Sequence, residues 1–533
     1  MFKFSGAKPI LTLIGGRVEV ITEDEYTAPL NESKLKVLLE VRGGDSTDDR
    51  PGLDLVAVLD VSESMDGDKL EKMKTAILFV IKKLTPIDRL SIVTFSDTAS
   101  IVSELCPISE KSQKNLEKLV NGLKVESGTN ILNGLIVGLE VVNKPGRSSD
   151  RVAGIMLMSD GEQTAGDAAT FTKAVVPVFT FGLGSNHDPV VLKAIADNNN
   201  GTFSDVQKTD NLSKAFSACL AGLVTVVVED LKLTISQVVD ESRIEHVSAG
   251  SYPKCKDDAA GSVTISFGEL YSKEERKVVV DLLLPAVTDG YDADVLKITY
   301  SYSFKGQRPI PPPPSILFAK RAGTNQEQQM SSKLLAEVTR ISTAQEMKNA
   351  RILADDGGET KTTMAKNKLI YAQNKLKEAD KSDPIIQMLQ SEIQQLIGLM
   401  EKEIIYQEQG RSFALSSETS HDRQRFATRG DDIDNVKLFA TPRMEKYIEQ
   451  AKLFDKDPEK PPHSAEEDVK KEITANSLPP VAGVSSFYIK AAIQSLQSAE
   501  RFISRGKDIY IEKAMNSLDE AVQCIESVKK AVS

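Results

Sequence analysis

Residues 53–64 read Leu-Asp-Leu-Val-Ala-Val-Leu-Asp-Val-Ser-Glu-Ser, and this stretch decides the fold. The apolar run from Leu53 to Leu59 is typical of a strand that is buried on both faces. An amphipathic helical pattern follows it, and further apolar runs stand at residues 90–95, 152–158 and 175–181, with helical stretches between and after them. Strands that alternate with helices predict a mainly parallel sheet covered on both faces, an α/β doubly wound, Rossmann-like domain over residues 53–224.

The segments on both sides of this domain alternate with a period of two residues, as half-buried strands do. Residues 10–42 and 226–304 each hold only a few such strands, and a small isolated sheet is marginally stable. We therefore expect one antiparallel β-sandwich, with residues 1–48 as its first part and 226–306 as its second, into which the α/β domain is inserted. Prolines then predict a stiff linker over residues 307–323.

The remainder of the chain is predicted to be helical, with a helical region at 325–453, a flexible linker at 454–480 and a C-terminal helical hairpin at 481–533. Apolar residues spaced alternately by three and four positions give each helix a seam that must be buried, most simply in an internal bundle. The seam residues are Ala365, Leu369, Ala372, Leu376 and Ala379; Ile386, Leu389, Ile393, Leu396 and Met400; and Ile511, Met515, Leu518, Val522 and Ile525.

Charge and cysteine content exclude several classes of function. The chain has 66 Lys and Arg against 77 Asp and Glu, a net charge of −11, which disfavours sequence-independent binding to nucleic acid or to an anionic membrane. Its four Cys form no C-x-x-C pair, so neither a zinc finger nor a disulfide framework is indicated. No run of 18 apolar residues exists that could span a membrane. We expect a soluble, cytoplasmic protein.

Oxygen-bearing side chains follow two of the predicted strands. Asp60, Ser62 and Ser64 come directly after the first strand at intervals of two residues, and Asp160 follows the strand at 152–158. Thr129 lies between them in a Ser-Gly-Thr-Asn turn that precedes a helix. Because ligands bind beyond the carboxyl ends of strands in an open parallel sheet, a site is expected at this edge. Carboxylate and hydroxyl oxygens are hard ligands that suit Mg²⁺ or Mn²⁺.

Five oxygens from three loops fall short of the six that such an ion takes. Water or a carboxylate from another molecule must fill the remaining position, so the pattern predicts a binding site that its ligand completes.

Asp-x-Ser-x-Ser, Gly-Thr-Asn and Ser-Asp-Gly together resemble the metal-ion-dependent adhesion site (MIDAS) of the von Willebrand factor A (VWA) domain family. The resemblance covers roughly residues 53–224. Glu63 stands where many members have Gly and places an extra carboxylate beside the site. The resemblance implies direct or water-mediated metal ligation by Asp60, Ser62, Ser64, Thr129 and Asp160.

The flanking regions resemble a plant group of VWA proteins with a C-terminal VWA/hedgehog-intein-like region. The helical segment Gly410-Arg411-Ser412-Phe413-Ala414-Leu415-Ser416-Ser417-Glu418-Thr419-Ser420-His421-Asp422-Arg423-Gln424-Arg425 carries this resemblance. Its relatives include the wavy-growth ubiquitin ligases, which have an N-terminal RING finger. This chain shows no Cys/His cluster and no splicing His-Asn end, so we expect neither intrinsic ligase activity nor self-splicing.

The leading interpretation is a binding module without catalytic residues, which takes an Asp or Glu of a partner protein. A relative or regulator of a ubiquitin-ligase system that has lost its RING finger is a second possibility. A Mg²⁺-dependent phosphoryl hydrolase is disfavoured, because haloacid-dehalogenase-like enzymes need a second Asp where this chain has Ser62. The C-terminal helices, residues 325–533, are expected to supply a metal-independent contact surface or self-association.

Overall fold

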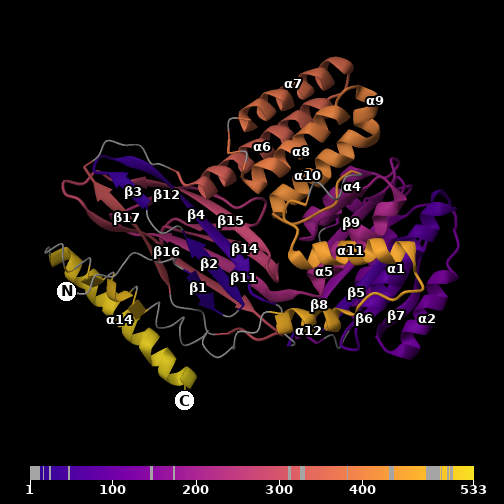
Figure 1. The fold of residues 1–533 in the computed structure, drawn as a ribbon, viewed down its shortest axis with the longest axis horizontal. Helices are drawn as coiled ribbons and strands as arrows, with labels where there is room; N and C mark the ends of the chain where they lie inside the picture. Colours follow the sequence, from indigo (N-terminus) through magenta and orange to yellow (C-terminus); the bar gives the residue numbers. More distant parts are fainter. Residues whose placement is uncertain are drawn as a thin grey trace. The chain divides into compact units, whose positions relative to one another are not determined.

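The computed structural model describes residues 12–15, 17–22, 26–45, 49–144, 148–171, 175–309, 314–323, 330–377, 379–380, 382–430, 437–475, 492–493, 495–497, 499–500, 503 and 508–532 (Figure 1). The chain divides into two compact units. One comprises Met1–Asp45, Val227–Glu337 and Ser477–Ser533, and the other comprises Ser46–Val226 and Val338–Asn476.

The first unit contains two mostly antiparallel sheets that share one hydrophobic core. In the first sheet the order is β1 (Thr12–Gly15), β2 (Val18–Thr22), β4 (Ser33–Gly43), β15 (Glu275–Leu284) and β12 (Arg243–Ser248). In the second it is β13 (Lys254–Asp257), β14 (Ser262–Tyr271), β11 (Val226–Gln237), β16 (Tyr291–Ser303), β17 (Ser315–Ala322) and β3 (Tyr26–Pro29).

Strands that lie far apart in the sequence pair in this unit. Val37 of β4 stands opposite Val280 of β15 in an antiparallel ladder, and β3 runs parallel to β17. Val37, Val280 and Leu233 of β11 are buried in the same core. This pairing supports the predicted sandwich with an inserted domain, which stays a prediction.

Deleting residues 1–48 tests that prediction, because it removes β1 to β4 and with them the strand β4 that pairs with β15. We expect the amides of β15 to lose at least a hundredfold of their protection from hydrogen exchange, while β8 in the second unit keeps its protection as the internal control. Unchanged exchange in β15 would show that the second part of the sandwich folds without the first.

The predicted linker over 307–323 is partly wrong. Residues 315–322 form β17, which pairs with β16 and β3. Its alternation of buried and half-buried residues is the ordinary strand pattern, which the preceding prolines obscured in the sequence. Residues 310–313, which hold three of those prolines, lie outside the described residues.

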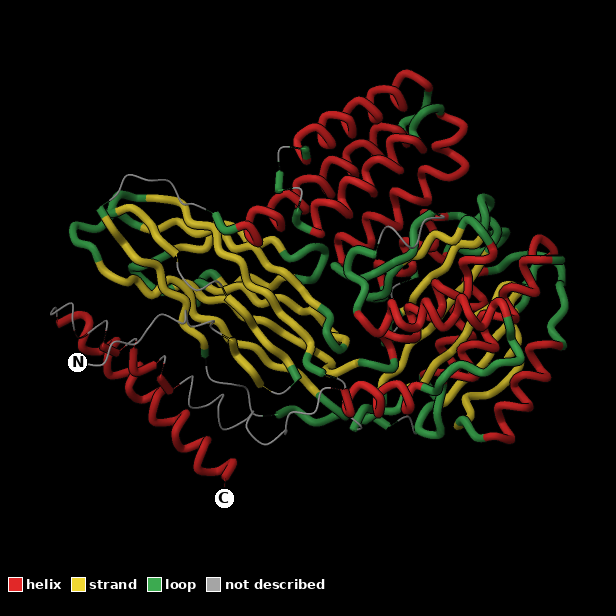
Figure 2. Tube along the Cα trace, viewed as in Figure 1, coloured by secondary structure: helices red, strands yellow, loops and turns green. Residues whose placement is uncertain are grey.

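The sheet of the second unit has the order β10 (Phe203–Val206), β9 (Val178–Leu183), β8 (Val152–Ser159), β5 (Leu53–Asp60), β6 (Arg89–Phe95) and β7 (Ala99–Pro107). All neighbours are parallel except β6 and β7. Helices cover both faces (Figure 2), as the alternating pattern predicted. They are α1 (Asp68–Lys83), α2 (Glu110–Asn121), α3 (Ile131–Val142), α4 (Pro189–Asn198) and α5 (Leu212–Leu223), with short turns η1 (Glu63–Met65), η2 (Ala168–Thr170) and η3 (Thr209–Asn211).

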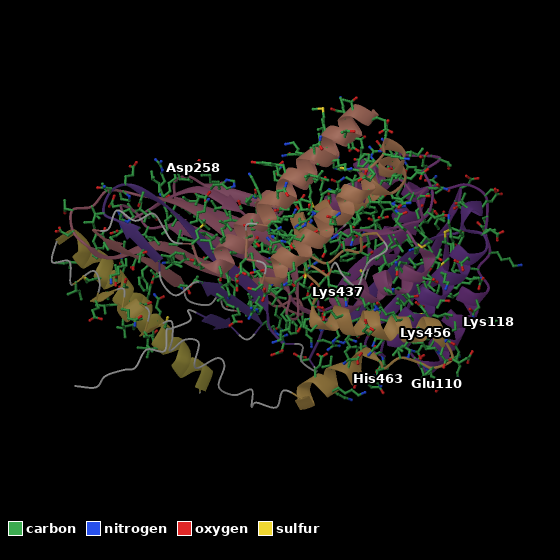
Figure 3. All side chains as sticks on the ribbon, turned by 45° about the horizontal axis from the view of Figure 1, so that its top comes forward. Glu110, Lys118, Asp258, Lys437, Lys456 and His463 are labelled. Atoms are coloured by element: carbon green, nitrogen blue, oxygen red, sulfur yellow. The ribbon has the colours of Figure 1, made fainter. Side chains whose placement is uncertain are left out.

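The helices that cover this sheet carry polar side chains on the sides that face away from it. Glu110 and Lys118 of α2 point away from the fold in Figure 3, whereas Leu116 and Val120 on the opposite side of the same helix are buried.

Among the described residues, no helix is both long and apolar enough to cross a membrane.

The C-terminal helices of this unit pack largely as predicted. They are α6 (Ser332–Asp355), α7 (Glu359–Leu376), α8 (Pro384–Leu399), α9 (Glu403–Ile405), η4 (Tyr406–Gly410), α10 (Arg411–Arg423), α11 (Pro442–Lys456) and α12 (Ala465–Ala475). The predicted seams of α7 and α8 meet in one core, where Leu369 and Ile393 are fully buried. The third predicted seam lies on α14 (Asp508–Val532) and is exposed, contrary to the expectation of an internal bundle.

The segment after α10 covers the edge of the sheet. The backbone N–H of Asp205 in β10 donates to the carbonyl of Thr428 at 2.9 Å, and Ser416 Oγ of α10 donates to the carbonyl of Phe203 at 3.1 Å. An edge strand with unpaired backbone groups invites pairing with other chains. The helical region therefore completes the α/β domain and closes this edge.

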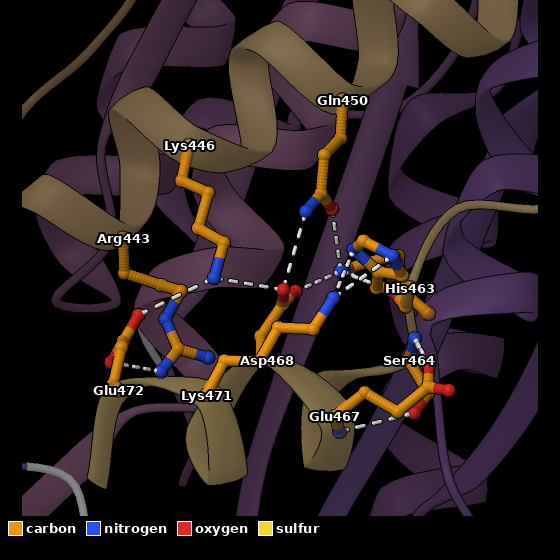
Figure 4. A network of polar contacts seen from close by, with 10 residues as sticks. Arg443, Lys446, Gln450, His463, Ser464, Glu467, Asp468, Lys471 and Glu472 are labelled. Carbon is orange, nitrogen blue, oxygen red and sulfur yellow. Dashed lines mark hydrogen bonds and ion pairs between the residues drawn. The ribbon is translucent and has the colours of Figure 1, made fainter. Parts of the chain in front are cut away.

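The predicted flexible linker over 454–480 contains α12, which corrects that prediction. Figure 4 shows Asp468 of α12 next to Lys446 and Gln450 of α11. Asp468 Oδ2 accepts a hydrogen bond at 2.5 Å from Lys83 Nζ of α1, and both side chains are fully buried. The prolines at 458, 461, 462, 479 and 480 suggested a mobile tether, and the pairing of Asp468 with Lys83 is invisible in the sequence. Residues 476–480 and 481–491 of the predicted linker and hairpin lie outside the described residues.

Candidate metal centre

Asp60 ends the strand β5, which lies inside the sheet between β8 and β6. The chain turns directly after it, so that the N–H of Ser62 donates to Asp60 Oδ1 at 2.8 Å. Ser159 Oγ, at the end of β8, donates to Asp60 Oδ2 at 2.6 Å. Asp60 is thereby fixed at the carboxyl edge of the sheet, where ligands of such sheets bind.

Asp160 meets the two serines of the loop after β5. Its Oδ1 accepts a hydrogen bond from Ser64 Oγ at 2.7 Å and lies 3.5 Å from Ser62 Oγ. The two hydroxyl oxygens are 3.0 Å apart. Four of the five predicted ligand residues thus form one connected cluster.

Thr129 reaches the same place from the third loop. A Cβ added to Gly161 would lie 3.7 Å from both Ser64 Oγ and Thr129 Oγ1, so these hydroxyls border the same small space. The loop is held by the N–H of Glu126, which donates to the carbonyl of Val61 at 2.7 Å. Gly128 adopts a φ of +82° there, which side-chain-bearing residues rarely adopt.

The electrostatics of the cluster suit a cation. Asp60 and Asp160 are both fully buried. Burial raises the pKa of Asp60 to about 6, although the hydrogen bonds from Ser159 and Ser62 oppose this rise and Asp160 adds to it. Two neighbouring buried carboxylates need positive charge nearby.

Lys69, which belongs to none of the sequence motifs, supplies such a charge. Its ammonium pairs with Asp160 Oδ2, and its side chain is only 26% exposed. Lys69 is the second residue of α1 and follows the Asp-x-Ser-x-Ser loop by five positions, so proximity in the sequence was the available signal.

None of the described contacts joins Glu63 to this cluster of side chains. Its Oε1 accepts a hydrogen bond from Ser127 Oγ at 2.7 Å, and the residue is exposed. Glu63 therefore links the first and third loops at the rim of the candidate site.

His187 lies near the cluster but is not arranged as a base. Its Nδ1 lies 2.6 Å from the carbonyl of Gly184, and its Nε2 lies 3.2 Å from Ser412 Oγ. Burial lowers the pKa of His187 to about 4, so the ring is neutral near pH 7. Nδ1 then donates and Nε2 accepts, which leaves no free nitrogen for catalysis.

The donor set fits a hard divalent cation. It consists of carboxylate and hydroxyl oxygens, and a lysine ammonium already lies against one carboxylate. Among the described residues, this site included, no group of three or more His, Cys, Asp or Glu side chains is placed to hold a metal ion, so a metal here would depend on the hydroxyl oxygens as well as on the two carboxylates. The mixed carboxylate and hydroxyl cluster is thus the candidate metal centre.

Comparisons with known proteins match two parts of the chain to domain families. Residues 54–218 match the profile of the von Willebrand factor type A domain, and residues 383–453 match that of the VWA / Hh protein intein-like domain. An uncharacterized protein of Synechocystis is 28% identical over 49% of this chain and 64% of its own length. The E3 ubiquitin-protein ligase WAV3 of Arabidopsis thaliana is 29% identical over 44% of this chain and 32% of its own.

The chain thus matches less than two thirds of the length of these curated relatives. Among solved structures, a von Willebrand factor type A protein from Catenulispora acidiphila has a TM-score of 0.53 at 16% identity, covering 71% of this chain and 91% of that one. This similarity concerns the fold. The chain therefore contains a VWA domain followed by a VWA / Hh protein intein-like domain.

Proposed function

We propose that the VWA domain is a metal-dependent protein-binding module. It binds one Mg²⁺ or Mn²⁺ through Asp60, Ser62, Ser64, Thr129 and Asp160, directly or through water. An Asp or Glu side chain of a cytosolic partner protein completes the coordination. The observation that carries this proposal is the convergence of oxygens from three loops on one space at the carboxyl edge of the sheet.

The same contacts support a role without catalytic turnover. The hydroxyls of Ser62 and Ser64 lie against each other and against Asp160, and neither contacts a base that could activate it. Ser62 also stands where a dehalogenase-like phosphatase needs a general acid. A bound metal would supply charge that attracts and orients a carboxylate in a partly dehydrated site.

A second candidate is a non-catalytic adaptor or regulator in a ubiquitin-ligase system. The similarity to WAV3 over 44% of this chain favours it. In such a role the VWA domain would recruit partners or substrates, so this candidate specifies the cellular setting of the same binding site.

The variant Asp60→Ala tests the metal site. We expect isothermal titration calorimetry to show Mg²⁺ binding to the wild type and none to the variant, because Asp60 contributes one of only two carboxylates. Asp66→Ala, which removes an exposed carboxylate of the same loop, is the matched control and should bind as the wild type does. Equal affinities in the wild type and Asp60→Ala would refute the assignment.

Binding of the partner protein should depend on the bound metal. A pull-down with the full chain should recover an acidic partner in Mg²⁺, and EDTA or Asp60→Ala should abolish recovery. A partner retained equally in EDTA would move the binding function to another surface. Steady hydrolysis of a general phosphatase substrate that Asp60→Ala abolishes would establish an enzyme instead.

A further inference from the structure

The two C-terminal helices bury small side chains and expose large ones. The second is α14, and the first includes the helical residues described between 492 and 503. Ala492 of the first contacts Cys524 near the end of the second, so the helices pack antiparallel. Their buried positions are almost all small: Ala492, Ser495, Ala499, Ala514, Ser517, Ala521 and Cys524.

Eight large aliphatic side chains occupy the outer side of this pair, which we call the aliphatic stripe. Each is between 40% and 62% exposed. Together they expose on the order of 800 Å², the area that each partner contributes to a standard protein–protein interface. The stripe consists of Ile493, Leu496, Ile503, Ile511, Met515, Leu518, Val522 and Ile525.

The spacing of the stripe on α14 indicates a helical occupant. Its five residues follow one another at intervals of four, three, four and three, which is the heptad seam by which helices pack on one another. The contact of α14 with the sheet uses another position, because Glu520 pairs with Lys297 of β16 at 2.6 Å. The side of α14 that this ion pair holds against the sheet is therefore a different side from the aliphatic stripe.

Charge indicates which helix covers the stripe. The sequence places four basic residues and one acidic residue in 490–507, and five acidic residues and three basic residues in α14, residues 508–532. A second copy of this chain therefore offers a segment of net positive charge to α14, whose net charge is negative. The exposed Asp519 and Glu526 beside the stripe disfavour an anionic membrane as the occupant.

We infer that the C-terminal hairpin is a self-association surface on which a second copy of this chain docks. The two hairpins form a four-helix bundle whose core is the two aliphatic stripes. This inference is independent of the proposed metal site. It predicts that one dimer presents two VWA domains, which increases avidity for a partner with repeated acidic motifs.

Sedimentation velocity of the full chain tests the inference. We expect the wild type at micromolar concentration to sediment as a dimer of the 58.2 kDa chain, and Met515→Glu/Val522→Glu to halve the mass. Asn516→Glu/Gln523→Glu adds the same charge at exposed polar positions of the same helix and should remain dimeric. Equal far-UV circular dichroism of all three proteins shows that the helices persist.

Two results would overturn the inference. One is a wild type that stays monomeric at tens of micromolar, including a monomer whose stripe binds anionic vesicles. The other is a Met515→Glu/Val522→Glu variant that remains dimeric while retaining its helical signal.

Discussion

Replacing Asp468 with Asn is expected to release α12 from the second unit. The substitution keeps the shape of the side chain but leaves the Lys83 ammonium buried without its counter-charge. Lys83 Nζ would retain only neutral acceptors, Gln450 Oε1 at 2.8 Å and the carbonyl of His463 at 2.5 Å, and the ring of Tyr447. Breaking a buried ion pair in this way costs about 3–5 kcal/mol.

Burial and mutual attraction act in opposite directions on the pKa of Lys83 and on that of Asp468. Burial lowers the pKa of Lys83 to about 8, and the attraction of Asp468 opposes this fall. Burial alone would raise the pKa of Asp468, but Lys83 and Lys446 outweigh it and lower that pKa. Each charge is therefore tolerated in the interior because the other is present.

Hydrogen exchange is the suitable measurement, because a chain of several units does not unfold in one step. The amides of α12 should lose protection by two to three orders of magnitude in Asp468→Asn. Glu466→Gln removes an exposed carboxylate of the same helix and should change protection by less than threefold. The double variant Lys83→Met/Asp468→Leu should recover most of the loss, since apolar side chains can replace a buried pair. Wild-type protection in Asp468→Asn would show that α12 is held by other contacts.

The elements that could be predicted from the sequence are those specified by local pattern. A strand buried on both faces must be apolar along its whole length, so β5 and β8 were visible in the sequence, and the polar residues that follow them marked the candidate site. Residues at intervals of three and four likewise revealed α7 and α8, whose seams are buried together. The turn that precedes a helix pointed to Thr129 as well, and the structure brings its hydroxyl to the same space.

The elements that escaped prediction depend on contacts between distant residues. β10 has only four residues and is defined by its pairing with β9 and by the cover from Thr428. The helix α12 is specified by the burial of Asp468 against Lys83, residues that lie far apart in the chain. A seam in the sequence shows that a helix must be covered but not what covers it, which is why the seam of α14 was assigned to an internal bundle although it is exposed.

The motif in α10 illustrates the same limit. The resemblance located the segment at 410–425, but the structure shows what its polar residues do. Ser417 Oγ and His421 Nε2 lie 2.6 and 3.1 Å from the carboxylate of Glu392 in α8, and Arg429 Nε lies 2.8 Å from it. Although burial alone would raise it, the pKa of Glu392 falls to about 2 because Arg429 and His421 stabilise the anion. The motif thus forms a buried ionic core that fixes α10 against α8.

Replacing Lys69 with Met is expected to make the stability of the VWA domain depend on a divalent cation. In the wild type the ammonium of Lys69 compensates the buried carboxylate of Asp160. Met has a similar length but carries no charge, so Asp160 would keep the hydrogen bond from Ser64 at 2.7 Å and the contact with Ser62 at 3.5 Å, both to neutral hydroxyls. Leaving a buried acceptor without its charged partner costs about 1–3 kcal/mol.

The proposed metal would offset that cost, because it supplies positive charge to the same carboxylate. In EDTA, Lys69→Met should therefore melt several degrees below the wild type, and Mg²⁺ should raise its melting temperature more than that of the wild type. Calorimetry should also show several-fold tighter Mg²⁺ binding, since no ammonium competes for Asp160. Lys72→Met, which removes a cation of the same helix that pairs with Asp210 at the surface, controls for a general change in charge.

The two roles that Lys69 can have predict opposite changes in Mg²⁺ affinity when Lys69 is replaced with Met. If the ammonium competes with the metal, its removal tightens binding and enlarges the thermal shift that Mg²⁺ produces. If the ammonium instead holds Asp160 in the orientation that the metal requires, Lys69→Met weakens binding and reduces that shift. Asp160 contacts Lys69 through one oxygen and Ser64 and Ser62 through the other, so two hydroxyl contacts to the carboxylate remain when Lys69 is replaced. We therefore expect competition, and weaker Mg²⁺ binding in Lys69→Met would contradict it.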